Sequence, residues 1–387
     1  MASSLLTKLD SQELEDWPQP SRQRRLRIGI DGRNLKRHGS GFIRYTVELC
    51  KALDVALPEA EFYVYSPFPV ELPIASDRWI SRVDNRSLSG RLRGAFWLKT
   101  RLGSMLRHDQ LDSFWGTVTF LPRLPNNVKK VISVHDVVHL IVPETMSFRL
   151  NLPLRLFFSR DCRKADAILT NSQGTADRLY ATLGCHTVGV VRPAVSQDFR
   201  PRSKTEIESC RAKYGIRTPY ILGVGVSVRR KNIETLIKAF AAMKQNGELP
   251  GYTLVLAGGA RVNDRGLNRL LADNQSDVKM LGYVEEEDLP ALYSGASVFA
   301  FPSLYEGFGI PALEARACCT RIVATDSPEL REAGGEDAVY ISPTIAGVCE
   351  GIREALRRPP PPPLRASQRP SWVDNVKPLA QALSAVD

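Results

Sequence analysis

Hydrophobic and polar positions follow one repeating pattern along most of the chain. Short apolar runs, such as residues 26–31 and 220–226, are each followed by a glycine-containing loop and then by a stretch with apolar residues at helical spacing. Strands that alternate with helices in this way form parallel sheets covered by helices on both faces. The pattern weakens over the polar residues 197–218 and then restarts. It therefore predicts an α/β fold with two doubly wound domains.

The pattern divides the chain into four parts. We expect a tail over residues 1–24, an N-terminal domain over residues 25–196, a C-terminal domain over residues 217–365 and a final helical segment over residues 366–387. Five consecutive prolines lie just before the last segment and predict a stiff spacer. A chain of 387 residues is long enough for two domains of this size.

Composition narrows the class of partner. The net charge of +10 predicts an acidic partner, which could be nucleic acid, an anionic membrane or a phosphorylated substrate. We expect no nucleic-acid partner, because no basic stripe with stacking aromatic residues and no known binding motif is present. Seven scattered cysteines without a C-x-x-C pair favour reduced cytoplasmic thiols over zinc ligands. Since neither an apolar leader nor a bilayer-length apolar run is visible, we expect a cytoplasmic protein.

Residues 86–108 form a basic segment that allows two interpretations. The segment holds six Lys and Arg residues and no acidic residue, and Phe96, Trp97 and Leu102 are interleaved with them. A basic amphipathic helix of this kind suits the surface of an anionic membrane. The alternative is a surface helix whose apolar face packs into the protein core. The sequence leaves both interpretations open.

Residues 301–314, FPSLYEGFGIPALE, are the strongest candidate for chemistry. They follow an apolar run that predicts a buried strand, and Gly307 and Gly309 then form a tight loop before a predicted helix. Free backbone N–H groups at such a loop suit a phosphate or a polar sugar.

Glu306 and Glu314 flank this loop with seven residues between them. At 1.5 Å per helical residue, the two carboxylates are roughly 12 Å apart. That separation is too large for two ligands of one metal ion, but it suits two hydroxylated rings joined by a diphosphate. The alternative is a strand-turn-helix corner with two solvated glutamates.

Two more candidates lie where predicted parallel strands end, and ligands gather at such ends. Arg230 and Lys231 come after one strand and at a predicted helix start, where two cations and the helix dipole can hold a diphosphate. The alternative for them is a plain basic helix cap. His135 lies at the end of another predicted strand and is followed by Asp136. The alternative for His135 is a structural role, which is more common than a catalytic one for a lone histidine.

The string EGFGIPALE resembles the EX7E motif of retaining glycosyltransferases of the GT4 type. The resemblance extends from Leu26 to Leu383 and implies the GT-B fold, in which two Rossmann-like domains face each other across a cleft and the last helix crosses back to the first domain. The opening IGIDGRNL…RYTVELCKAL is most similar to mannosyltransferases of bacterial polysaccharide and O-antigen assembly. It implies a hexosyltransferase with GDP-mannose as the first donor to consider, a lipid-linked or oligosaccharide acceptor, and contact with the inner face of the plasma membrane.

Other activities remain compatible with this fold. UDP-, dTDP- or ADP-sugars are alternative donors, and a nucleotide-sugar epimerase or a phosphorylase is an alternative enzyme class. No D-x-D motif occurs at a strand end. We therefore expect transfer without a metal ion and without a cofactor other than the nucleotide sugar.

The resemblance also implies roles for individual residues. Catalytic roles fall to His135, which would face the donor sugar and diphosphate, to Glu306 on the sugar hydroxyls, and to Arg230 and Lys231 on the diphosphate. The implied donor-binding residues are Gly225, Tyr283, Val284, Gly307, Phe308, Gly309 and Glu314, the last of them on the ribose. The implied acceptor-side loop is Gly39, Ser40 and Gly41. Phe42, Ile43 and Arg229 depart from the residues that are commonest in the family at their positions.

Overall fold

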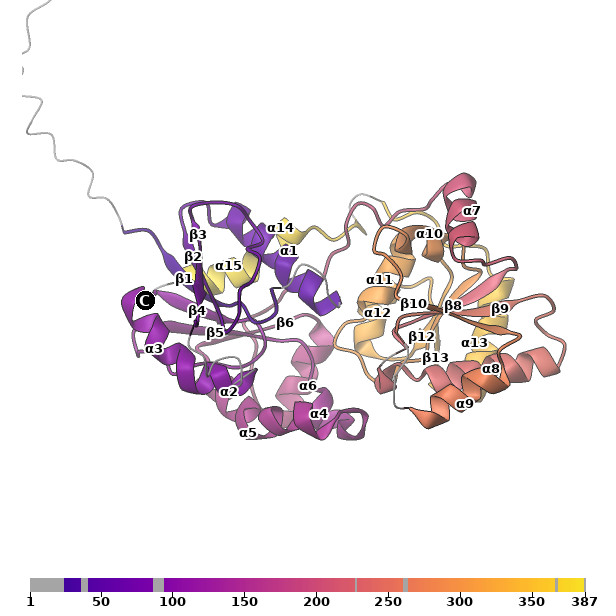
Figure 1. Cartoon of the computed structure of the whole chain (residues 1–387), viewed down its shortest axis with the longest axis horizontal. Helices are drawn as coiled ribbons and strands as arrows, with labels where there is room; N and C mark the ends of the chain where they lie inside the picture. The colour runs from indigo at the N-terminus through magenta and orange to yellow at the C-terminus, as the bar shows by residue number, and fades with distance from the viewer. Residues whose placement is uncertain are drawn as a thin grey trace, which may run out of the picture.

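The structure is a computed structural model that describes residues 24–35, 41–85, 94–226, 228–259, 264–365 and 368–385. These residues form two sheet-and-helix domains that lie next to each other along the long axis of the molecule (Figure 1). The α/β fold with two doubly wound domains is thereby confirmed. The expected tail lies outside the described residues, apart from residue 24.

The first sheet has seven parallel strands in the order β3-β2-β1-β4-β5-β6-β7. The strands are β1 (Arg27–Asp31), β2 (Glu61–Ser66), β3 (Trp79–Val83), β4 (Ser113–Gly116), β5 (Lys129–Val134), β6 (Ala167–Thr170) and β7 (Gly189–Val190). Most are apolar runs because helices cover both faces of the sheet. The edge strand β3 has only Trp79 fully buried, so its sequence lacks the apolar run that would have predicted it.

The second sheet has six parallel strands in the order β10-β9-β8-β11-β12-β13. The strands are β8 (Tyr220–Val224), β9 (Thr253–Ala257), β10 (Val278–Gly282), β11 (Val298–Phe301), β12 (Ile322–Thr325) and β13 (Val339–Ile341). In both sheets the strand order reverses direction at the first strand of the domain, which is the topology of a nucleotide-binding α/β domain.

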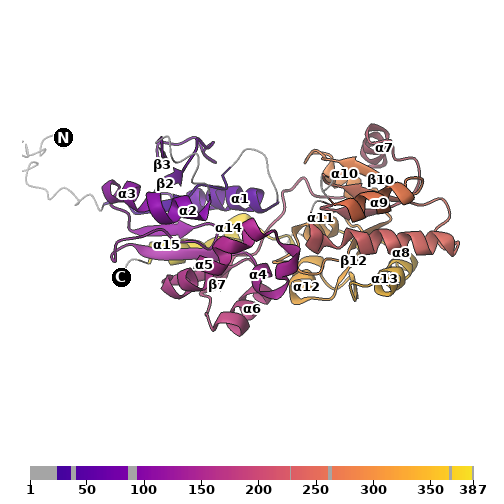
Figure 2. The ribbon, with the colours of Figure 1, turned by 60° about the horizontal axis from the view of Figure 1, so that its bottom comes forward.

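Helices cover both faces of each sheet (Figure 2). Those of the first domain are α1 (Gly41–Ala56), α4 (Val138–Ile141), α5 (Phe148–Lys164) and α6 (Gln173–Leu183). Those of the second domain are α7 (Lys204–Lys213), α8 (Ile233–Gln245), α9 (Arg265–Asp273), α10 (Leu289–Ser294), α11 (Ile310–Ala317), α12 (Pro328–Gly334) and α13 (Ile345–Arg357). The hydroxyl of Ser172 accepts a hydrogen bond from the Thr175 N–H and so caps α6, as its position in the sequence predicts.

The end of the chain returns to the first domain, where it appears in yellow beside the indigo strands and α1 (Figure 1). It forms two short helices, α14 (Trp372–Asn375) and α15 (Lys377–Ser384), instead of one continuous helix. Val376, Leu379 and Leu383 are buried in the core of the first domain. The expected crossover is therefore confirmed, with a break between its two helices.

Residues 94–108 form a series of short helical turns rather than one helix. The turns are α2 (Ala95–Trp97), a π-helical turn (Leu98–Leu102), α3 (Gly103–Met105) and a 3-10 turn (Leu106–His108). Trp97, Leu98 and Leu102 are fully buried, and Lys99 pairs with the buried Asp161. The apolar face of this part packs into the core, as the second of the two interpretations proposed. Residues 86–93 of the basic segment lie outside the described residues.

No helix within the described residues is both long and apolar enough to cross a lipid bilayer.

Candidate active site between the two domains

The pair of neighbouring strands β8 and β11 determines where the candidate site lies. The chain runs outward from this pair in opposite directions, so the loops that follow the two strands diverge and leave room for a ligand. Arg230 and Lys231 follow β8, and Glu306 follows β11. Because β8 and β11 pair in parallel, these residues meet at the same edge of the sheet although they are distant in the sequence.

The carboxylate of Glu306 lies between two cations. Its Oε2 is 2.7 Å from Nη1 of Arg230, and its Oε1 is 2.8 Å from Nζ of Lys231. The side chains of Glu306 and Lys231 are buried, with residue exposures of 5% and 8%. Burial alone would raise the pKa of Glu306, but the two cations outweigh burial and hold this pKa at about 2. Glu306 is therefore ionised at neutral pH and is a weak base.

The loop after β8 holds the two cations in place. Arg229–Lys231 forms a single 3-10 turn, and α8 begins only at Ile233, so the cations precede the helix instead of lying in its first turn. Gly225 has a φ of +91°, and a Cβ at this position would lie 3.2 Å from Cε of Lys231. Nζ of Lys231 is also 4.3 Å from the centre of the Phe301 ring, a favourable cation–π distance.

Glu314 lies in α11 and is contacted by the other domain. Arg44 of α1 forms an ion pair with its Oε1, and the hydroxyl of Tyr293 donates a hydrogen bond of 2.9 Å to its Oε2. Arg44 also lies 2.6 Å from Glu286. Burial would lower the pKa of Arg44, but the charges of Glu314 and Glu286 outweigh burial and raise this pKa. Glu314 is only 4% exposed, so α1 and its neighbours cover it.

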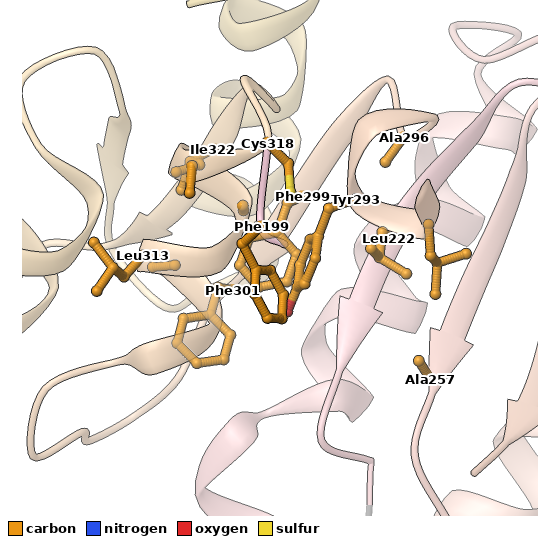
Figure 3. Packing of buried hydrophobic residues seen from close by; sticks show 14 of the residues in the cluster. Phe199, Leu222, Ala257, Tyr293, Ala296, Phe299, Phe301, Leu313, Cys318 and Ile322 are labelled. Carbon is orange, nitrogen blue, oxygen red and sulfur yellow. The ribbon is translucent and has the colours of Figure 1, made fainter. Parts of the chain in front are cut away.

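Four aromatic side chains of the second domain's core, Phe199, Tyr293, Phe299 and Phe301, pack next to one another (Figure 3). Neighbouring ring centres are 6.3 Å apart for Phe199 and Tyr293, 5.4 Å for Tyr293 and Phe299, and 5.3 Å for Phe299 and Phe301. One end of the row carries Arg44, 5.4 Å from the Phe199 ring centre, and the other end carries Lys231. The row connects the two charge clusters through apolar side chains.

His135 lies at the end of β5 and faces the same boundary between the domains. Its Nε2 is 2.7 Å from the carbonyl oxygen of Thr117, and the rings of Phe42 and Tyr45 meet it edge-on at 4.5 and 5.4 Å. Burial lowers the pKa of His135, so the ring is neutral at pH 7. With Nε2–H donating to Thr117, Nδ1 carries no proton and can accept one hydrogen bond.

Gly307 is a point of close contact between the two domains. A methyl group at this position would collide with the carbonyl oxygen of His135. The hydroxyls of Ser172 and Thr175 donate hydrogen bonds of 2.6 and 2.9 Å to the Gly307 carbonyl. The loop that carries Glu306 is therefore fixed by backbone contacts with the first domain.

Two ion pairs to α12 continue this contact, one from α6, which adjoins α12 in both views (Figures 1 and 2), and one from the segment after β7. Arg178 lies 2.5 Å from the fully buried Glu329, and Arg192 lies 3.0 Å from Glu332. Glu332 also accepts a hydrogen bond from the backbone N–H of Gly174. The two domains are thus connected by charged contacts as well as by the glycine loop.

The structure brings together most of the residues that the sequence singled out. Phe308 is buried, and Gly309, with a φ of +97°, precedes the first turn of α11. Gly41 begins α1 next to Ile310, to which a Cβ would approach within 3.7 Å. Gly39 and Ser40 lie outside the described residues.

Two predicted donor-binding residues lie further out, in the loop after β10. Tyr283 is 67% exposed, whereas Val284 is buried. Neither is recorded in a side-chain contact with the two charge clusters within the described residues, so their role stays a prediction.

Sequence reasoning missed Arg44, Tyr293 and Tyr305. Tyr305 precedes Glu306, and its hydroxyl accepts a hydrogen bond from the Val137 N–H, which connects the Glu306 loop to the chain after His135. A basic residue in the first turn of α1 was a usable signal for Arg44, because it follows directly on the predicted acceptor-side loop. The sequence carried no comparable signal for Tyr293, which lies in an ordinary apolar helix.

No group of three or more His, Cys, Asp or Glu side chains is arranged to hold a metal ion within the part of the chain that the structure describes. Transfer without a metal ion stays a prediction.

The chain has two α/β domains with parallel sheets, and its charged site lies where the strand order of the second sheet reverses. These features define the class of two-domain GT-B proteins. The solved structure of WaaG, a glycosyltransferase involved in lipopolysaccharide biosynthesis, has a TM-score of 0.67 at 16% identity and covers 93% of this chain and 100% of its own. Alr3699/HepE from Anabaena, solved in complex with UDP-glucose, has a TM-score of 0.61 at 17% identity and covers 92% of this chain and 94% of its own. At these identities the likeness shows the fold.

Sequence comparison carries the assignment further. Residues 206–369 match the family described as "Glycosyl transferases group 1". O-antigen chain mannosyltransferase B of Escherichia coli is 27% identical over 338 residues, which cover 82% of this chain and 87% of that protein. O-antigen chain mannosyltransferase RfbU of Salmonella typhimurium is 26% identical over 323 residues, which cover 80% and 85%. The resemblance to glycosyltransferases of the GT4 type is thereby confirmed.

Proposed function

We propose that this protein is a retaining hexosyltransferase that moves mannose from GDP-mannose to a lipid-linked or oligosaccharide acceptor in surface polysaccharide assembly. The match to the group 1 family supports glycosyl transfer, and the names of the two relatives support mannose as the sugar and O-antigen as the product. UDP-, dTDP- and ADP-sugars are the other donors to test.

The contact of Glu306 with Arg230 and Lys231 is the observation that carries the proposal. The departing nucleoside diphosphate gains negative charge in the transition state, and fixed cations in a water-poor site stabilise that charge strongly. Glu306 fixes both cations, the Tyr305 carbonyl also accepts a hydrogen bond from Arg230, and Gly225 and the Phe301 ring contact Lys231. The two cations can therefore act on the leaving group without first being reoriented.

The low pKa of Glu306 argues for a binding role. A carboxylate with a pKa of about 2 takes up a proton poorly, so it suits hydrogen bonds from sugar hydroxyls better than general-base catalysis. We assign the acceptor proton to an oxygen of the departing phosphate, on the same face of the sugar, which preserves the anomeric configuration. His135, neutral and with Nδ1 free of a proton, is suited to accept a hydrogen bond from a sugar hydroxyl.

For the acceptor side, we propose that a lipid-linked saccharide reaches the site from the cytoplasmic face of the membrane. In the described part of residues 86–108, Lys99 and Arg101 pair with buried aspartates, so anionic headgroups would be met by exposed basic side chains such as Arg107. UDP-glucose bound to a solved neighbour of the same fold supports a nucleotide-sugar donor.

A panel of GDP, UDP, dTDP and ADP, compared by thermal shift and calorimetry, tests the donor. The matching nucleotide should raise the melting temperature, because a ligand that binds only the folded state stabilises it. Lys231→Ala should weaken its binding by roughly 10- to 100-fold, since a charged hydrogen bond contributes about 1.5–3 kcal/mol. Lys244→Ala is the matched control, because Lys244 forms an ion pair with Asp277, which precedes β10 at the opposite edge of the sheet.

Product analysis tests the reaction. NMR of the product should show the same anomeric configuration as in the donor. The transfer rate should not change when EDTA is added. Unchanged nucleotide affinity in Lys231→Ala would remove the phosphate role from this lysine. An epimer formed from the nucleotide sugar without an acceptor would replace the proposed transferase by an epimerase.

A further inference from the structure

Arg44 belongs to the first domain but forms its ion pairs with the second. It contacts Oε1 of Glu314 and lies 2.6 Å from Oε1 of Glu286, while its guanidinium is 5.4 Å from the centre of the Phe199 ring. These partners come from α11, from the loop after β10 and from the segment that connects the domains. One side chain of α1 is thus held by three separate segments.

These contacts cover Glu314, the carboxylate that the resemblance to the GT4 family assigns to the donor ribose. Both oxygens of Glu314 are engaged, one by Arg44 and the other by Tyr293, and the residue is 4% exposed. A ribose hydroxyl would therefore have to compete with Arg44 for the approach to Oε1 of Glu314.

A buried carboxylate without a partner is costly, so the empty enzyme needs a cation at Glu314. Arg44 meets this need. Its second partner, Glu286, has a side chain that is 58% exposed and lies further out. Glu286 can therefore keep Arg44 after Arg44 has left Glu314.

We propose that Arg44 is a positioning residue that competes with the donor nucleoside for Glu314. In the empty enzyme it covers Glu314 and ties α1 to α11. When the nucleoside takes over Glu314, Arg44 moves to Glu286 alone and α1 moves with it. This inference rests on the proposed function, because it assumes that Glu314 binds the donor ribose.

Calorimetry on the full chain tests the competition with two probes, the nucleoside diphosphate that binds best and inorganic pyrophosphate. Arg44→Ala should tighten nucleoside diphosphate binding roughly fivefold or more, within the usual range of coupling between sites. Pyrophosphate has no ribose, so its affinity should not change. Arg44→Lys should restore the wild-type affinity for the nucleotide, because the ammonium still pairs with Glu314.

Glu286→Gln should change the nucleoside diphosphate affinity in the opposite direction. Without its outer partner, Arg44 should stay on Glu314, and nucleoside diphosphate binding should weaken roughly two- to threefold. The KM for the donor should follow the same order across the variants. Arg192→Ala is the matched control, since it removes an ion pair between the domains away from Glu314 and should leave nucleotide affinity unchanged.

Each result decides between distinct conclusions. Weaker nucleotide binding in Arg44→Ala would make Arg44 a direct donor ligand and overturn the competition. Equal tightening in Arg192→Ala would attribute the effect to general loosening of the two domains and also overturn it. If neither wild-type protein nor Arg44→Ala bound any nucleoside diphosphate, the proposed function itself would be wrong.

Discussion

Glu306 and Glu314 belong to one motif, yet their surroundings differ in kind. Glu306 receives both of its cations from its own domain, and its loop is fixed by backbone contacts. Glu314 receives its cation from the other domain, through Arg44. The cations that pair with Glu306 are supplied by the second domain alone, although its loop also contacts the first domain at Gly307, whereas the cation that pairs with Glu314 depends on the relative position of the domains. One motif therefore combines a rigid chemical site with a contact that can respond to binding.

The comparison predicts the largest effect for Glu306→Gln. Half-buried Arg230 and buried Lys231 would both lose their carboxylate partner. Removing one partner of a buried ion pair lowers the unfolding free energy by about 3–5 kcal/mol. Glu314→Gln should cost less, because Arg44 keeps Glu286. Urea unfolding of the two variants measures the difference.

The same two variants distinguish the roles of the two carboxylates in catalysis. Glu306→Gln should abolish detectable transfer, whereas Glu314→Gln should act mainly through the KM for the donor. Equal stability losses in the two variants would contradict the distinction between a rigid and a responsive carboxylate.

Gly307→Ala perturbs the position of the domains without removing a charge. The added methyl group would collide with the His135 carbonyl oxygen, which cannot rotate away as a side chain can. We expect a larger radius of gyration by small-angle scattering and a loss of kcat of roughly 100-fold, as for a misplacement of about 1 Å. An unchanged radius and rate would show that the contact at Gly307 is not needed for transfer.

The pH dependence of stability provides a third test. The pKa of Glu306 is about 2 in the folded protein, below its value of roughly 4.3 in the unfolded chain. A lowered pKa contributes stability that is present above the unfolded value and is lost as pH falls through the folded value. Glu306 should therefore contribute about 3 kcal/mol above pH 4.5, lost progressively towards pH 2. The difference between wild-type and Glu306→Gln unfolding curves should shrink over that interval, and a constant difference would contradict it.

Tyr293→Phe has the smallest expected effect and probes the other side of Glu314. It removes the hydrogen bond of 2.9 Å to Oε2 and leaves Arg44 in place. The unfolding free energy should fall by about 1–2 kcal/mol in a urea titration. A loss as large as that of Glu306→Gln would show that Tyr293, and not Arg44, is the main support of Glu314.

Local patterns in the sequence were sufficient to predict most of the fold. Apolar runs predicted strands such as β1, β5 and β8 because buried parallel strands have few polar positions. The glycine loop before α11 was also readable, since it depends on a few neighbouring residues. The edge strand β3 was not, because its residues are mostly half-buried.

The candidate site was predictable only in part. The sequence indicated which charged residues follow strand ends, and topology then brings those ends together. It could not indicate that Arg44 pairs with Glu314, because the two residues are 270 positions apart and the contact depends on how the domains meet. Nor could it decide whether the apolar face around Trp97 packs against lipid or protein, since both environments select the same side chains.

The return of the chain end to the first domain has a consequence for biosynthesis. Val376, Leu379 and Leu383 complete the core beside α1, so the first domain lacks part of its interior until these residues leave the ribosome. Its final consolidation therefore waits until the second domain has been synthesised, although most of its own strands emerge first. A fragment ending near residue 200 should accordingly aggregate or require a chaperone, while supplying residues 368–385 in trans should improve its yield of soluble protein.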